Sequence, residues 1–114
     1  MDDLAGLYIA TLKVLGDTLV TMTGSKWDAA MQDATAQQRT DAALLMLSVQ
    51  EARLTLANTA LADILDKLKE NEDGLQKGID RLQSALDSLA KVERVLNSIS
   101  SILSIVARIV PLVA

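Results

Sequence analysis

The residue types that perform most enzymatic chemistry are scarce in this chain of 114 residues. It contains no histidine and no cysteine, which removes the commonest general base, the commonest metal ligand and every thiolate nucleophile. The serines have no base beside them, and no glycine-rich phosphate-binding loop is present. The composition therefore predicts a protein that is not an enzyme and that binds no cofactor.

Carboxylates gather at two places where a cation site must be considered. Glu70, Glu72 and Asp73 form one acidic segment, but it lacks the alternating oxygen ligands of a calcium loop. Asp63 and Asp66 are expected on one helix face, but Lys67 follows Asp63 by four residues, which is the spacing of an ordinary ion pair on a helix surface. We expect a solvated turn and a surface ion pair here, and no metal site.

The elements that must position all other side chains are predicted to be helices. Hydrophobic residues make up 50% of the chain, aromatic residues only 2%, and the single proline, Pro111, lies close to the end. Leucine and alanine favour helices, whereas a sheet protein would carry more aromatic and β-branched residues in alternation. The chain is therefore predicted to be all-α, with one helical domain over residues 1–114.

The spacing of apolar residues predicts three helices, at about 2–22, about 26–71 and about 75–110. Gly24 suits a helix stop and Ser25 a helix start. The polar stretch at 25–40 either continues the second helix or precedes a fresh start near Thr40. Asn71 and Gly74 suit a turn, which joins two long antiparallel helices, about 25/41–71 and 75–110. The expected fold is this elongated hairpin, about 60 Å long, packed with the shorter N-terminal helix as a coiled-coil-like three-helix bundle.

Leucines at intervals of seven mark the expected seam of this bundle, because such a repeat is typical of coiled-coil packing. Ala43, Ala57 and Ile64 occupy the second position of the repeat, with Gln50 as its polar exception. The seam consists of Leu47, Leu54, Leu61, Leu68, Leu75, Leu82, Leu89 and Leu96.

The last twenty residues carry one charge, Arg108, and a broad apolar face. Helices of unequal length leave part of the seam uncovered, and large exposed apolar faces normally mark partner or membrane contacts. The predicted interaction face consists of Val95, Ile99, Ile102, Leu103, Val106, Ile109, Val110 and Val113. The polar face of the same helix consists of Asn97, Ser101, Ser104 and Arg108.

The net charge of the chain and its distribution indicate which classes of partner to expect. The chain has a net charge of −4 and no dense basic face, so nucleic acid is not an expected partner. The N-terminus is acidic and is interrupted by Lys13 and Asp17, unlike a cleavable secretory signal. We expect a cytoplasmic protein, or one secreted without a cleavable signal, as with many bacterial proteins that lack cysteine.

The expected function is that of a non-enzymatic interaction or assembly protein. It would form homo-oligomers or dock on a larger helical partner through its leucine-heptad faces. The alternative is a membrane-active protein, pore-forming or lipid-surface-binding, that inserts its amphipathic C-terminal helix on assembly. Arg108 and the polar residues around it make a simple membrane span the least favoured option, because an arginine near the bilayer centre costs about 2.5–3.5 kcal/mol.

Overall fold

The computed structural model describes residues 4–88 and 91–110. Every regular element in these ranges is a helix, which confirms the all-α class. The helices number six rather than three within the described residues: α1 (Leu4–Met22), α2 (Ser25–Gln32), α3 (Ala36–Ala57), α4 (Leu61–Glu70), α5 (Glu72–Ser88) and α6 (Val92–Ile109).

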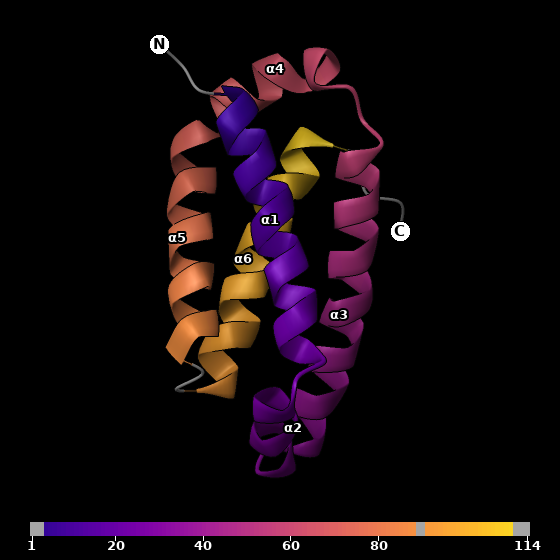
Figure 1. The fold of residues 1–114 in the computed structure, drawn as a ribbon, viewed down its shortest axis with the longest axis vertical. Coiled ribbons are helices and arrows are strands. Elements are labelled where there is room, and N and C mark those ends of the chain that lie inside the picture. Colours follow the sequence, from indigo (N-terminus) through magenta and orange to yellow (C-terminus); the bar gives the residue numbers. More distant parts are fainter. Residues whose placement is uncertain (1–3, 89–90, 111–114) are drawn as a thin grey trace.

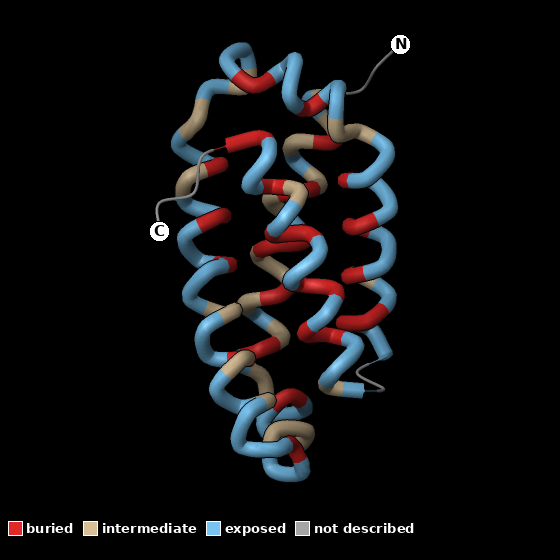
Figure 2. The backbone as a smooth tube through the Cα atoms, turned by 180° about the vertical axis from the view of Figure 1, so that it is seen from behind, coloured by how far each residue is buried: buried red, intermediate tan, exposed pale blue. Residues whose placement is uncertain are grey.

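The four long helices run alongside one another, and the two short helices close the ends (Figure 1). In that view α1 lies in front of α6, with α5 and α3 on either side, α4 across the top and α2 at the bottom. Buried positions face inward along each long helix (Figure 2). Side chains from all six helices join one hydrophobic core, inside a slab that measures 44 × 28 × 18 Å.

The prediction of one long helix at 26–71 is wrong, because the chain breaks twice in this range. The first break lies between α2 and α3, where Thr35 caps α3. The Thr35 hydroxyl accepts a hydrogen bond from the Gln38 amide, and the Gln38 side chain accepts one from the Thr35 amide, both at 3.0 Å. This capping box satisfies amides that a continuous helix would have bonded within itself. The fresh start therefore lies at Ala36, not near Thr40.

The second break separates α3 from α4 at residues 58–60. The Asn58 amide still donates to the Leu54 carbonyl at 3.0 Å, and the Thr59 hydroxyl donates to the Thr55 carbonyl at 2.7 Å. Ala60 is extended, with φ −66° and ψ 131°, and this residue changes the chain direction. As a result, α4 lies across the end of the bundle (Figure 1). Tyr8 of α1 reinforces this corner, since its hydroxyl donates to the Leu56 carbonyl at 2.8 Å and to the Thr59 carbonyl at 3.2 Å.

The predicted helix at 75–110 is also wrong, because it is two helices that lie side by side. α5 begins at Glu72, so Gly74 belongs to a helix rather than to the predicted turn. Lys91 is extended, with φ −145° and ψ 129°, and α6 runs back antiparallel to α5 (Figure 1). The fold-back buries the apolar faces of both helices against each other. A straight helix of this length would have left much of those faces in water.

Candidate interaction surfaces

The predicted interaction face of the C-terminal helix lies inside the molecule. Its described members are all buried: Val95, Ile99, Ile102, Leu103, Val106, Ile109 and Val110. Val113 lies outside the described residues. Ile102 packs against Gly78 of α5, where the missing side chain lets the two helices approach. The expectation of an uncovered face is therefore corrected: α5 and α3 of the same chain cover it.

The polar face of α6 is turned to solvent, as its residue types suggest. Asn97, Ser101, Ser104 and Arg108 are all exposed. With its apolar side inward and its polar side outward, α6 has the pattern of an ordinary surface helix of a globular protein. The solvent-facing side of α6 therefore has no large apolar area that a partner could cover.

The predicted leucine seam divides into a buried part and an exposed part. Leu68, Leu75, Leu82 and Leu96 are buried and Leu61 is half-buried, whereas Leu89 lies outside the described residues. Leu47 and Leu54 are 62% and 64% exposed. The seam prediction is therefore wrong for α3, whose core-facing residues are others.

Helix α3 carries two apolar stripes on opposite sides. The inner stripe faces the core and consists of Ala42, Leu45, Val49, Ala52 and Leu56. The outer stripe faces solvent and consists of Ala43, Leu47, Gln50, Leu54 and Ala57. Both follow the alternating three- and four-residue spacing of a helix-packing seam. A helix that is apolar on both sides is normally buried on both sides, but the described chain covers only the inner stripe.

A groove of about 290 Å³ runs beside the outer stripe, between α3 and α6. Leu44, which is exposed, and the half-buried Leu45 form its apolar wall, while Asn97 and Ser100 of α6 line the other side. The apolar surface of α3 therefore extends from the outer stripe toward α6.

Helix α1 has an unusual distribution of polar and apolar side chains. Ile9 and Val20 point to solvent and are 63% and 71% exposed, whereas Thr11 and Thr18 are buried. Each buried hydroxyl donates to the carbonyl four residues earlier, Thr11 to Leu7 and Thr18 to Val14, both at 2.7 Å. Leu7, Val14 and Leu15 of the same helix are buried as expected, so Ile9 and Val20 are apolar exceptions on an otherwise ordinary outer side.

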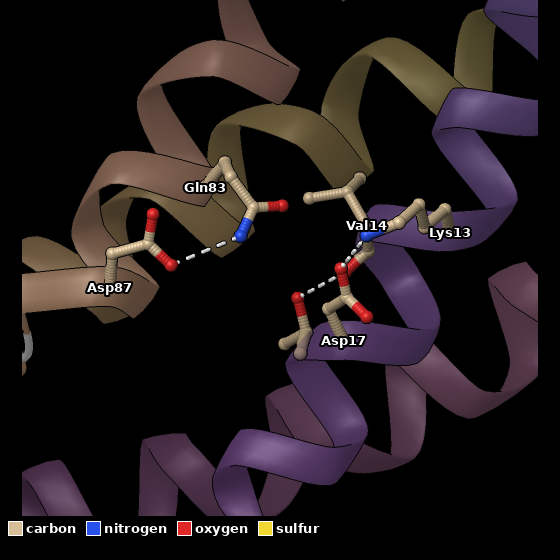
Figure 3. Close-up of polar contacts among 6 residues, drawn as sticks. Lys13, Val14, Asp17, Gln83 and Asp87 are labelled. Atoms are coloured by element: carbon tan, nitrogen blue, oxygen red, sulfur yellow. Dashed lines mark hydrogen bonds and ion pairs between the residues drawn. The ribbon is translucent and has the colours of Figure 1, made fainter.

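The charged residues of α1 also find their partners within the helix. Lys13 Nζ lies 2.7 Å from the Asp17 carboxylate, beside the Gln83–Asp87 hydrogen bond of α5 (Figure 3). Among the described residues, α1 is the one helix long and apolar enough to cross a membrane, and only 28% of that window is buried. Sequence reasoning assigned membrane contact to the C-terminal helix and overlooked Ile9 and Val20, whose signal was that they fall outside the apolar stripe of α1.

The acidic segment of Glu70, Glu72 and Asp73 lies where α4 ends and α5 begins. Lys67 pairs with Glu70 at 3.7 Å, rather than with Asp63 as expected from the spacing. Glu72 and Asp73 lie in the first turn of α5, where acidic side chains interact favourably with the helix dipole. Within residues 4–88 and 91–110, no group of three or more acidic side chains is arranged to hold a metal ion.

No protein-family model, curated protein or solved structure matches this chain.

Proposed function

We propose that the protein is a non-enzymatic helical assembly protein that associates with a second copy of itself through the outer stripe of α3. One observation carries the proposal, namely that α3 has a stripe of apolar residues on each of two opposite sides, and Gln50 is the one polar residue in the outer stripe. Exposing Leu47 and Leu54 on one regular stripe is unfavourable for a monomer, because apolar surface in water raises the free energy. A second helix laid along the stripe removes that surface from water.

The order of residues in the outer stripe suits a two-fold symmetric partner. Alanine, leucine, glutamine, leucine and alanine follow one another, so the stripe reads the same from either end. A two-fold interface brings the same patch of both subunits together and must be self-complementary. In an antiparallel pair with its two-fold axis beside Gln50, Leu47 of one copy faces Leu54 of the other, and Ala43 faces Ala57. The two Gln50 side chains then meet at the axis, where their amides can hydrogen-bond to each other, and a polar residue in such a seam disfavours other registers.

The size of the stripe predicts a dimer that depends on concentration. Stable interfaces bury about 1,600 Å² in total. One exposed side of α3, a helix of 22 residues, offers less than that, even with the neighbouring Leu44. We therefore expect a reversible monomer–dimer equilibrium rather than an obligate dimer.

Sedimentation equilibrium over a range of protein concentrations tests this proposal. The wild type should approach the dimer mass as concentration rises, and Leu47→Glu or Leu54→Glu should remain monomeric, because each places a charge in the seam. Ser84→Glu is the matched control, since Ser84 is exposed on α5, away from α3. A wild type that stays monomeric throughout, or a control that dissociates as readily as the stripe variants, would refute the assignment.

We propose contact with a lipid surface through α1 as the second candidate function. The observation that favours it is the outward placement of Ile9 and Val20 beside inward-facing threonines. Cations flank this outer side of α1: Lys13 is exposed on α1 itself, and the Arg53 guanidinium of α3 lies against Gly16. Apolar strips bordered by lysine and arginine are typical of helices that lie in the membrane interface.

Co-sedimentation with phosphatidylcholine vesicles separates the two candidates. Ile9→Asp and Val20→Asp should reduce vesicle binding and leave the monomer–dimer equilibrium unchanged. Leu54→Glu should do the opposite, so each variant serves as the control for the other surface. Vesicle binding that Ile9→Asp and Val20→Asp leave intact would exclude α1 as the lipid-contacting helix.

A further inference from the structure

A cavity of about 460 Å³ lies between α5 and the first half of α6, and neither proposal above uses its basic residues. Three of the chain's eleven basic residues line it, namely Arg81 from α5, Lys91 just before α6 and Arg94 from its first turn. Glu93 is the one acidic residue in the lining. The antiparallel packing of α5 and α6 brings Arg81 together with two cations that lie ten and thirteen residues further along the sequence.

The positive charge of this cavity is only partly offset by Glu93, the one carboxylate in its lining. Within the described residues, the ion pairs involve Lys13 with Asp17 and Lys67 with Glu70, and none involves a cation of the cavity. The chain as a whole has a net charge of −4, so a local excess of positive charge runs against its overall balance. Clefts lined by one sign of charge attract ions of the opposite sign.

A buried hydroxyl in the wall of the cavity provides a second, independent observation. Ser98 is only 4% exposed and lines the cavity. Its hydroxyl makes no hydrogen bond to any described residue, whereas the buried hydroxyls of Thr11 and Thr18 both bond to their own helix. Among the described residues, every side-chain nitrogen or oxygen that is fully shielded from solvent has a hydrogen-bond partner. Because the Ser98 oxygen has no such partner, it is not fully shielded, and it is open to the cavity. A hydroxyl with little access to water gains from an acceptor placed there.

We infer that this cavity binds an anion of the phosphate type. Two guanidinium groups and one ammonium supply charge and directional donors for phosphate oxygens, and the Ser98 and Ser101 hydroxyls add neutral donors. The volume falls within the range of small-ligand sites, about 300–1,000 Å³. The chain's two aromatic residues, Tyr8 and Trp27, belong to α1 and α2, so no ring in this cavity can stack on a nucleobase.

The ligand is therefore a compact phosphate-bearing group, carried either by a small soluble molecule or by a lipid headgroup. Both sources present the same oxygens and the same negative charge. They differ in whether the anion is free in solution or fixed to a bilayer, and the probes below are chosen to separate them.

Titration of ¹⁵N-labelled protein with inorganic pyrophosphate, followed by amide chemical shifts, tests the site. Amides of residues 91–101 should shift in a saturable way. Arg94→Gln should weaken binding by about tenfold, the effect expected for loss of a charge-assisted hydrogen bond, and Ser98→Ala should weaken it by less. The control is Arg108→Gln, which removes the same charge from an exposed arginine of the same helix outside the cavity.

A parallel experiment measures co-sedimentation with phosphatidylcholine vesicles that contain phosphatidic acid. Pyrophosphate binding without vesicle binding identifies a soluble ligand, whereas vesicle binding that Arg94→Gln weakens and Arg108→Gln spares identifies a headgroup. Binding of neither probe overturns the inference. So does an equal loss in Arg94→Gln and Arg108→Gln, since that reports attraction by net charge alone. Circular dichroism of each variant confirms that the helices remain folded.

Discussion

The two sides of α3 can be compared directly by making the same substitution on each. Leu54 and Leu56 are two residues apart in one helix, yet Leu54 is 64% exposed and Leu56 is fully buried. Leucine-to-alanine changes the intrinsic helix propensity by the same small amount at both positions. Any difference in stability between the two variants therefore measures burial.

The structure predicts a large difference between the free energies of unfolding of these variants. Leu56→Ala removes a buried side chain and leaves a cavity among the core residues, which typically costs about 2–5 kcal/mol. Leu54→Ala removes a side chain that is already mostly in water, so a change within about 0.5 kcal/mol is expected, as for most surface substitutions. Leu56→Ala should thus be the less stable variant by at least about 1.5 kcal/mol.

Urea unfolding followed by circular dichroism at 222 nm measures both values. The protein must be dilute enough to be monomeric, because dimerisation through the outer stripe would stabilise the wild type relative to Leu54→Ala by mass action. If the free energy of unfolding falls with urea concentration at the same rate in both variants and the wild type, their unfolded states are comparable. Equal destabilisation at the two positions, or a larger effect at Leu54, would refute the orientation of α3. It would mean that the seam of Leu47 and Leu54 faces the core.

Two further substitutions test local features of the fold. Thr35→Ala removes the capping box with Gln38 and should lower the free energy of unfolding by about 1 kcal/mol. The same urea titration measures this change. An unaffected stability would count against a helix start at this position. Gly78→Ala should raise the melting temperature, because alanine is favoured over glycine within a helix by about 0.8–1 kcal/mol. The added methyl group would lie 3.5 Å from Ile105 and 3.7 Å from Ile102, which is ordinary contact, so a lower melting temperature would show that α5 and α6 pack more tightly than described.

Prediction from the sequence fails where helices end without a strong local signal. The segment between α5 and α6 contains neither glycine nor proline, and the leucine repeat continues through it, so nothing local marks a reversal. The break between α2 and α3 had a signal in Thr35 and Gln38, which have the spacing of a capping box. That signal was outweighed by the apolar periodicity on either side of it.

The candidate binding residues were harder to predict than the helices. Arg81 and Arg94 are thirteen residues apart in the sequence and line one cavity because α6 folds back along α5. The sequence did carry a weak signal, since residues 75–114 have a net charge of +2 in a chain with a net charge of −4. An excess of charge over a segment does not indicate which side chains share a cavity.

Composition alone determined that this protein is helical, because a chain rich in leucine and alanine, with few aromatic residues and one proline near its end, has no other favourable secondary structure. Only the tertiary structure decided which apolar face of each helix is internal. On α3 the stripe of Leu47 and Leu54 continues the seven-residue leucine repeat, but the stripe with Ala42 and Ala52 faces the core. Small side chains let α1 and α6 pack close to α3, and a seam buried within a chain has the same spacing as one buried between two chains.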